Sequence, residues 1–218
     1  MHLLDRGKYM DKVYCDFLAK QGKENTIVCK HSVIKEIWTS DEKSIGIYQN
    51  LELNITEIDN QRRFISNTQN KGILVEKLNC DVNFDFCKLY KDIVSSFGCI
   101  KDLYNFQSKY FENIAELFTY DKESIGLGEW KLDYENKVRK SGVFHGIKAS
   151  DLYTFAYEAN GNRWLMDFKG DVFLYANDPN YKGISILKNH PKYTFYEVNG
   201  IKTIENFFML FLQDFAAK

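Results

Sequence analysis

Alternating apolar runs separated by glycine turns dominate the stretch between residues 153 and 175. Aromatic or apolar side chains occupy every second position of 153–157 and of 164–168, and a further apolar run covers 172–175. Asn160-Gly161 and Lys169-Gly170 stand between these runs. Because Asn-Gly between alternating segments is the strongest short signal for a hairpin, the pattern predicts three consecutive antiparallel strands, a meander.

Apolar residues elsewhere in the chain recur at the helical or the strand period. Spacings of three and four predict helices, and short β-rich runs broken by polar turns predict strands. The expected helices cover about residues 4–20, 83–97, 100–118 and 203–216, and the further strands lie within 26–79 and over 184–187 and 193–198. These elements predict an α+β fold, in which a twisted antiparallel sheet packs against helices, with an N-terminal helix and a C-terminal helix.

The domain organisation follows from the length and from the change of pattern along the chain. The chain has 218 residues, against a typical domain of roughly 150. We place a boundary at residue 80, between an N-terminal helix plus β-rich segment over 1–80 and an α+β domain over 81–218. The alternative is that both segments belong to one domain, since no low-complexity linker separates them.

Charge and cysteine usage argue against several classes of protein. The 29 basic and 30 acidic residues give a formal net charge of −1, so the charge excess of a dedicated nucleic-acid binder is absent. The five cysteines are odd in number and contain no CxxC pair, which argues against a disulfide framework and a zinc site. The sequence has no membrane-spanning apolar stretch and no signal-peptide pattern. We therefore expect a cytoplasmic protein without a direct nucleic-acid or membrane partner.

The C-terminal succession of turns, acidic residues and strands resembles the SUKH superfamily. The matching features, over about residues 143–216, are Asn160-Gly161, Asp167, Gly170-Asp171-Val172, Asn177-Asp178 and a tail helix that contains Ile204-Glu205-Asn206-Phe207-Phe208. That superfamily includes yeast regulators of cell-wall synthesis and bacterial immunity proteins that bind and neutralise toxins. The resemblance implies a SUKH-like α+β domain within 81–218 and a non-enzymatic, protein-binding function.

We therefore expect an immunity protein that neutralises a toxin by covering its active site. Lysine strongly outnumbers arginine, a bias that fits a bacterial source. Interfaces favour Tyr and Trp, and carboxylates steer a basic partner such as a nuclease. The candidate partner-binding residues are Asp171, Asp178, Tyr181, Trp130 and Trp164. A regulatory scaffold without a toxin partner is an alternative, and the oligomeric state is open at this point.

Catalytic and metal sites are the rival class. The four histidines are scattered singly without metal-ligand spacing, so we expect no catalytic residue, no metal and no cofactor. The rival prediction is a small hydrolase or transferase that uses His145 with a cysteine or an aspartate. An acidic cluster of Asp167, Asp171 and Asp178 is a further candidate for acid–base chemistry, although such residues more often cap turns.

The alternation also predicts which side chains form the core. In a strand with one buried face, Tyr153, Phe155 and Tyr157 point inward while Thr154 and Ala156 point outward. The C-terminal helix, with Thr203 as its N-cap, is too apolar around its circumference for a surface element. We expect it to pack on the meander through Phe207, Phe208, Leu210, Phe211, Leu212 and Phe215.

Overall fold

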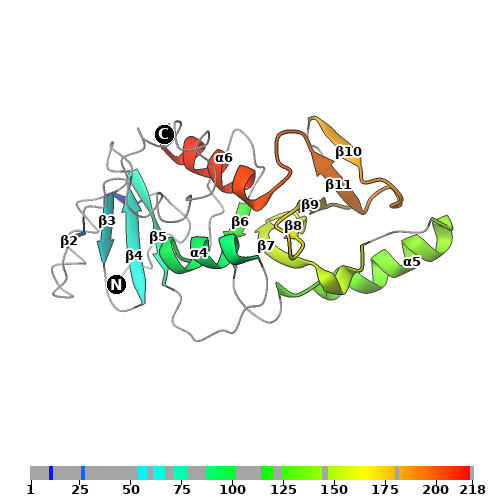
Figure 1. The fold of residues 1–218 in the computed structure, drawn as a ribbon, viewed down its shortest axis with the longest axis horizontal. Coiled ribbons are helices and arrows are strands. Elements are labelled where there is room, and N and C mark those ends of the chain that lie inside the picture. The colour runs from blue at the N-terminus through cyan, green and yellow to red at the C-terminus, as the bar shows by residue number, and fades with distance from the viewer. Residues whose placement is uncertain are drawn as a thin grey trace.

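The fold is described for residues 10–11, 26–27, 54–57, 61–66, 71–77, 87–101, 114–119, 124–143, 147–179 and 182–216 of a computed structural model. These residues form two antiparallel sheets, of five and six strands, and three α-helices (Figure 1). The helices are α4 (Lys88–Ser96), α5 (Lys131–Ser141) and α6 (Ile204–Ala216). The predicted α+β class is confirmed.

The larger sheet contains the predicted meander. Its strand order is β10-β11-β9-β8-β7-β6, and all neighbours are antiparallel. Gly161 and Gly170 close the meander turns at φ angles of 88° and 89°, a region that glycine enters without strain. The predicted strands are confirmed as β7 (Tyr153–Glu158), β8 (Arg163–Met166), β9 (Val172–Tyr175), β10 (Ile184–Ile186) and β11 (Phe195–Val198), and β6 (Ile114–Leu117) completes the sheet.

The smaller sheet is built from the first part of the chain. It contains β1 (Met10–Asp11), β2 (Thr26–Ile27), β3 (Asn54–Glu57), β4 (Arg62–Ser66) and β5 (Lys71–Glu76), in the order β1-β5-β4-β3-β2. The helix predicted over about 4–20 is not confirmed. Met10 and Asp11 pair with Gly72 and Lys71 as a strand, and the rest of that segment lies outside the described residues.

A short extended segment connects the two sheets. Cys99 exchanges backbone hydrogen bonds of 2.7 and 2.9 Å with Glu76 at the end of β5, and Ile100 exchanges two of 2.8 and 2.9 Å with Leu117 of β6. The preceding Gly98 has φ +106°, and a Cβ there would lie 2.6 Å from the carbonyl oxygen of Glu76. A glycine at this position therefore allows the close approach of the two backbones.

The helix predicted over about 100–118 is wrong at both of its described ends. Ile100 forms the bridge to β6, and Ile114–Leu117 is itself a strand, paired with β7. A short apolar run fits both the helical and the strand period, and here the neighbouring β7 satisfies its backbone groups. Residues 102–113 lie outside the described part. The helix predicted over 83–97 is confirmed over Lys88–Ser96.

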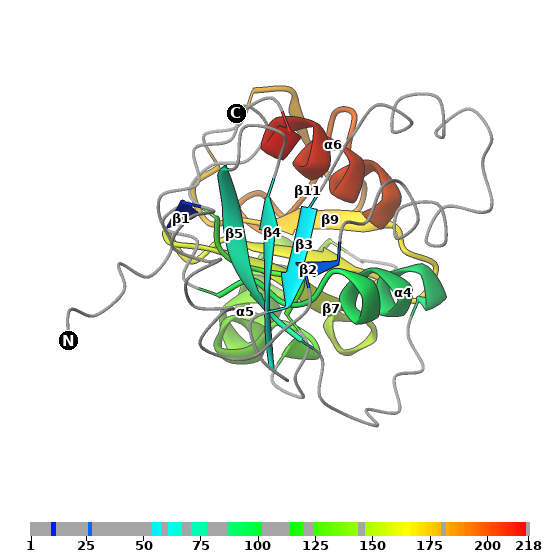
Figure 2. The same ribbon diagram turned by 90° about the vertical axis from the view of Figure 1, so that its left-hand side faces the viewer.

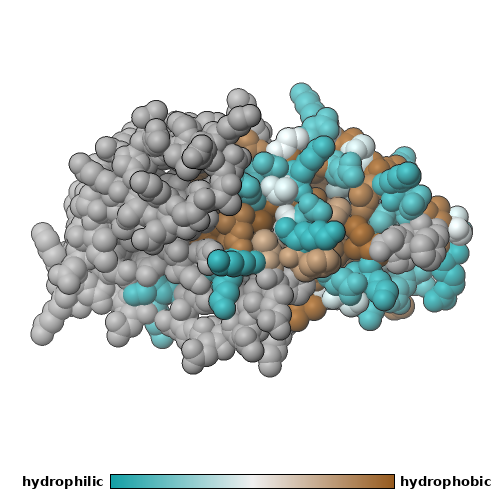
Figure 3. Space-filling model, in the orientation of Figure 1, coloured by the Kyte–Doolittle hydropathy of each residue, from teal (hydrophilic) through white to brown (hydrophobic). Residues whose placement is uncertain are grey.

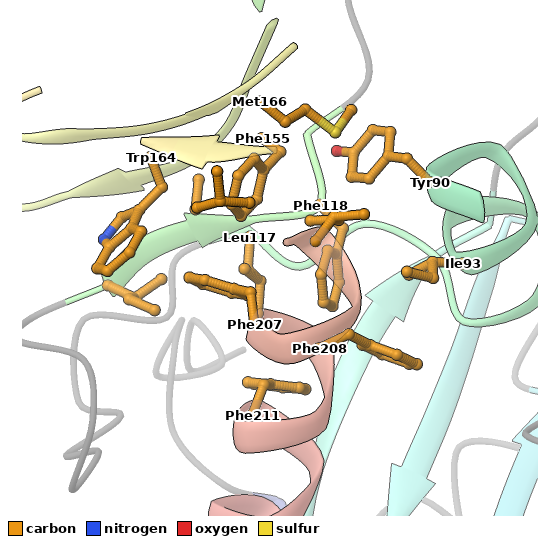
Figure 4. Close-up of a cluster of buried hydrophobic side chains, with 14 of the residues drawn as sticks. Tyr90, Ile93, Leu117, Phe118, Phe155, Trp164, Met166, Phe207, Phe208 and Phe211 are labelled. Carbon is orange, nitrogen blue, oxygen red and sulfur yellow. The ribbon is translucent and has the colours of Figure 1, made fainter. Parts of the chain in front are cut away.

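One face of the larger sheet packs against α6, as predicted (Figure 4). The ring of Phe207 lies 4.8 Å from that of Phe155 and 5.2 Å from that of Trp164. Phe208 and Phe211 approach Phe118 at 5.3 and 5.7 Å. The same core includes residues of α4 and of the smaller sheet, namely Tyr90, Ile93, Val94, Ile65, Ile73 and Val75. The segments on either side of residue 80 thus share one core.

The opposite face of the larger sheet is also covered. Figures 1 and 2 show α6 and α5 on opposite sides of the strands, and a 3-10 turn, η2 (Gly128–Trp130), leads into α5. Thr154 and Ala156 are fully buried, so the prediction that they face outward to solvent is wrong. A β-bulge between these two residues interrupts the alternation of β7, so Ala156 belongs to the α6 core. Tyr157, predicted to point into the core, is half-buried and pairs with Arg163. The second, smaller core cluster on this side is Leu127, Tyr134, Leu152, Leu165, Tyr175, Leu187 and Phe195.

Replacing Phe211 by Ala should lower the free energy of unfolding by about 3–5 kcal/mol, because its ring is fully buried. Chemical denaturation followed by circular dichroism measures this loss. Met209→Ala, at a half-buried position of α6, is the control and should cost less. A melting temperature within about a degree of the parent, together with lost self-association, would show α6 to be an interface.

Gly98→Ala should destabilise the fold by about 1–3 kcal/mol, because it combines a strained φ with a clash against a backbone carbonyl. Gly142→Ala is the matched control, since Gly142 also has a positive φ, +66°, but a Cβ there meets nothing within 4 Å. Denaturant midpoints of the two variants are compared. Equal losses would show that only backbone strain matters at Gly98.

Candidate functional site

The side of the larger sheet that faces α5 carries a connected set of charged and aromatic side chains. We call this set, Trp130, Asp133, Lys137, Arg163 and Tyr175, the α5 face. Trp130 belongs to η2, Asp133 and Lys137 to α5, Arg163 to β8 and Tyr175 to β9. The set therefore joins the helix to two central strands of the sheet.

Lys137 is the centre of a polar network that fastens α5. Its Nζ lies 2.7 Å from Oδ2 of Asp133, one helical turn earlier, and this carboxylate also accepts a 3.3 Å hydrogen bond from the Tyr175 hydroxyl. The same Nζ donates to Oδ1 of Asn177 at 2.6 Å and to the backbone oxygen of Tyr193 at 3.0 Å. One ammonium group thus holds the helix to two loops at the end of the sheet.

Aromatic rings pack beneath this network. The ring of Tyr134 lies 5.1 Å from Phe195 in an edge-to-face arrangement, and Tyr175 lies 5.4 Å from the same ring. Trp130 is half-buried, with its ring 6.3 Å from Tyr175. His190 is buried against Phe195 at 5.2 Å. These contacts form a closely packed layer of rings beneath the α5 face, and Trp130 lies at the edge of this layer.

Burial raises the pKa of two tyrosine hydroxyls, that of Tyr175 in the α5 face and that of Tyr134 packed beneath it. It raises the pKa of Tyr134 to about 12. Burial, reinforced by the negative charge of Asp133, raises the pKa of Tyr175 well above its usual value. A hydroxyl with a raised pKa is a hydrogen-bond donor at neutral pH and not a base or a nucleophile. These two tyrosines therefore serve packing and positioning.

Arg163 is a buried cation on this face. Its side chain is 9% exposed, and its Nη2 lies 3.4 Å from Oε1 of Glu129, whose side chain is 80% exposed. The guanidinium carbon stands 4.9 Å from the ring centre of Tyr157, the residue that pairs with Arg163 on β7. Among the described residues, Nε of Arg163 is buried without a hydrogen-bond partner.

The predicted partner-binding residues do not form one cluster. Trp130 and the exposed Asp178 lie toward the Tyr175 end of β9, whereas the exposed Asp171 precedes β9 at the opposite end. Tyr181 lies outside the described residues. Trp164 is fully buried, and its Nε1 donates a 2.7 Å hydrogen bond to Glu158, so its selection as a partner-binding residue is corrected.

The candidate acidic cluster is not assembled either. Oδ1 of Asp167 accepts hydrogen bonds from the backbone N–H groups of Lys169 and Asp171, at 2.8 and 3.0 Å, and so caps the β8–β9 turn. Asp178 lies beyond the far end of β9. His145, the centre of the rival enzymatic prediction, lies outside the described residues. Asp167 therefore acts on a turn, the role that the sequence analysis named as more common.

The described part of the chain has neither a cluster of metal-binding side chains nor a membrane-spanning helix. No group of three or more His, Cys, Asp or Glu side chains among the described residues could hold a metal ion. None of the described helices is long and apolar enough to cross a membrane. On the face shown in Figure 3, hydrophilic residues are interspersed with apolar ones. The large apolar side chains with the most exposure are Ile125, Leu132, Phe168, Ile186 and Tyr193.

Sequence reasoning missed Arg163, and it missed Lys137 together with α5, the helix that carries it. Residues 131–141 are mostly hydrophilic, and Tyr134 is the fully buried residue among them, so they lack the apolar stripe that marks a core-facing helix. The Gly142 that ends α5 in a left-handed conformation was a usable signal, since glycine commonly follows a helix.

Comparisons with protein-family models, with curated proteins and with solved structures gave no match for this chain.

Spectrophotometric titration should reveal the buried tyrosines. A pKa raised in the folded state means a stability contribution that is present below pH ~10, the unfolded value, and lost as the pH rises through about 12 for Tyr134. In native protein, part of the tyrosine absorbance change should therefore occur only at the high pH at which the protein begins to unfold. In denaturant, all tyrosines should titrate near pH ~10.

Tyr134→Phe tests the assignment of that late step. The variant should lose one tyrosine from the delayed part of the titration and keep the early part. An unchanged delayed amplitude would contradict the burial of the Tyr134 hydroxyl.

Proposed function

We propose that this chain is a protein-binding protein of the SUKH type, and specifically a bacterial immunity protein that acts in the cytoplasm on a protein toxin. The observation that carries the proposal is the order of elements from β7 to α6. Strand, Asn-Gly turn, strand, Lys-Gly turn and strand follow one another in the succession on which the resemblance rests. The closing helix comes after two further strands, β10 and β11. The packing of α6 on these strands supports it further.

The surface that best fits such a partner lies at the Tyr175 end of β9. Trp130 is half-buried there, Tyr193 is exposed, and Asp178 is an exposed acid. Burial is the main cause that raises the pKa of Tyr196, and the negative charge of Asp178 raises it further, so Asp178 lies close to that ring. Tyr and Trp are favoured at interfaces, and an exposed carboxylate such as that of Asp178 accelerates association with a basic partner. Lys137 fixes the loops that carry Asn177 and Tyr193, so this surface is held in place before binding.

The mechanism is occlusion of the toxin's active site. A preorganised surface loses little side-chain freedom when it binds, and the affinity gains accordingly. The central strands of the six-stranded sheet, covered on both faces, supply the rigid support. Binding alone then inhibits the toxin, without a chemical step on either protein.

The experiment uses the toxin encoded next to the gene of this chain as the test partner. We expect the full chain to bind that toxin, to inhibit it in solution, and to rescue growth of cells that express it. Asp178→Lys should weaken binding about tenfold, mainly through slower association, and should reduce its salt dependence. Trp130→Ala should also weaken binding, through faster dissociation.

Asp171→Lys is the matched control, since it makes the same charge change at the other end of β9. It should bind within about twofold of the parent. Absence of binding and of rescue would reject the immunity function. Binding without inhibition would favour a scaffold, and equal effects of Asp171→Lys and Asp178→Lys would reject the proposed surface.

A further inference from the structure

Arg163 has far more hydrogen-bonding capacity than the described residues use. A guanidinium carries five N–H donors and remains charged at any pH that a protein tolerates. Here the described residues offer it one carboxylate contact, from Nη2 to Glu129 at 3.4 Å, and Nε is buried without a partner. The residue as a whole is 8% exposed, so water replaces few of the missing bonds.

The ion pair with Glu129 is unequal. The glutamate side chain is 80% exposed and keeps most of its hydration, whereas the arginine side chain, 9% exposed, has lost most of it. A pair at this distance with one partner in water contributes little to stability. A buried charge that is incompletely paired is costly, so Arg163 gains from a closer anion.

The guanidinium is held in position by its neighbours. The ring of Tyr157 lies 4.9 Å from its carbon atom. Gly128, at φ +53°, comes so close that a Cβ there would lie 3.0 Å from Nη1. These contacts reduce the freedom of the side chain before any ligand arrives, which lowers the entropic cost of binding.

The charges around Arg163 favour a singly charged ligand. Arg163 contributes one positive charge, and Glu129 contributes a negative charge beside it. A second negative charge is that of Asp133, which accepts a hydrogen bond from the hydroxyl of Tyr175. Tyr175 is the residue of β9 that pairs with Arg163 in the sheet. A doubly charged phosphate would be repelled by these acids more strongly than a carboxylate. The planar fork of a guanidinium also matches the two oxygens of a carboxylate.

We propose that Arg163 is a carboxylate-binding site, at which the ligand takes the place of Glu129. The exposed Glu129 side chain turns into solvent, and the incoming carboxylate pairs with the guanidinium beside Trp130. The carboxylate comes either from an acidic side chain of a protein or from a small acid. This site goes beyond the proposed function, because carboxylate binding is measurable without any toxin.

The experiment follows the Nε–Hε signal of Arg163 by nuclear magnetic resonance, assigned through its proximity to the Tyr157 ring. The full chain is titrated with sodium acetate over a millimolar range, and in parallel with sodium chloride and sodium phosphate at the same ionic strength. We expect a saturable shift with acetate and smaller, non-saturating shifts with the other two salts. N-acetylglutamate amide, which presents the carboxylate on a peptide-like backbone, distinguishes the sources. Tighter binding than acetate indicates a protein side chain, and equal or weaker binding indicates a small acid.

Two matched variants decide whether Glu129 occupies the site. Glu129→Gln removes the internal competitor and should tighten acetate binding about two- to fivefold, the range that an exposed ion pair can contribute. Glu135→Gln makes the same change on α5, where Glu135 pairs with Lys131 at 4.0 Å, and should leave acetate binding unchanged. Arg163→Lys removes the Nε–Hε signal, so its titration follows the backbone amide of Gly128, which lies beside the guanidinium. The saturable acetate shift of that amide, present in the parent, should be abolished, and circular dichroism checks folding.

The proposal fails if chloride reproduces the acetate shift, because the effect would then be screening by salt. It also fails if Glu129→Gln and Glu135→Gln bind acetate equally. If Arg163→Lys does not fold, the comparison of the two glutamate variants still decides, since both changes are made at exposed positions. Loss of toxin binding has no influence on this readout, so the two proposals fail separately.

Discussion

The aromatic stripe of α6 is the contact on which the two sheets and α4 depend. Its phenylalanines meet rings from four other segments at edge-to-face angles, an arrangement that packs densely and adds attraction beyond burial. The partner rings are Phe118, Phe155 and Trp164, which Figure 4 labels, and Phe97 at the end of α4. Residues of the smaller sheet complete the same core. Without α6, the inner faces of both sheets would lose their shared apolar cover.

The start of α6 ties this core to the candidate binding surface. Thr203 caps the helix by accepting a 3.2 Å hydrogen bond from the N–H of Asn206, which confirms the predicted N-cap. The N–H of Ile204 donates to the carbonyl of Gly170 in the β8–β9 turn, at 2.8 Å. The helix therefore fixes where β9 begins, and β9 carries Tyr175 and the loop beyond it to the α5 face.

The two covers of the larger sheet differ in kind. α6 adheres through a continuous apolar face, whereas α5 adheres through Tyr134, partly buried apolar neighbours and the polar contacts of Lys137. Elements with few apolar contacts open at a lower free energy than the core. The α5 face thus combines a packed aromatic layer with a helix that polar contacts hold in place.

The candidate site was predictable only in part. Trp130 and Asp178 were recognised because they stand in loops, where side chains tend to reach the surface. Trp164 was misjudged because its strand has both faces covered, so that no position of β8 is free for a partner. Arg163 was overlooked for the same reason. Its side chain points to the opposite face of the sheet from that of Trp164, and a charged residue in that position suggests a solvent-exposed face. Its burial depends on η2, more than thirty residues earlier in the chain, where Gly128 and Glu129 contact the guanidinium.

The amino-acid sequence by itself determined the elements whose signals are local. Alternation and the glycine turns specify the strands β7, β8 and β9, because a turn residue with positive φ joins strands that are only a few positions apart. The β-bulge that shifts the pairing of β7 with β8 between Thr154 and Ala156 has no such local signal. The apolar circumference of α6 likewise requires burial wherever it lies. Tertiary structure alone decided that Ile114–Leu117 is a strand, that 99–100 bridges the sheets, and that a polar helix covers the outer face. Each of these features depends on partners that are distant in sequence. A short apolar segment, or a polar one, fits several environments by itself. Only a distant partner that satisfies its backbone hydrogen bonds, or excludes water from its side chains, selects one of them.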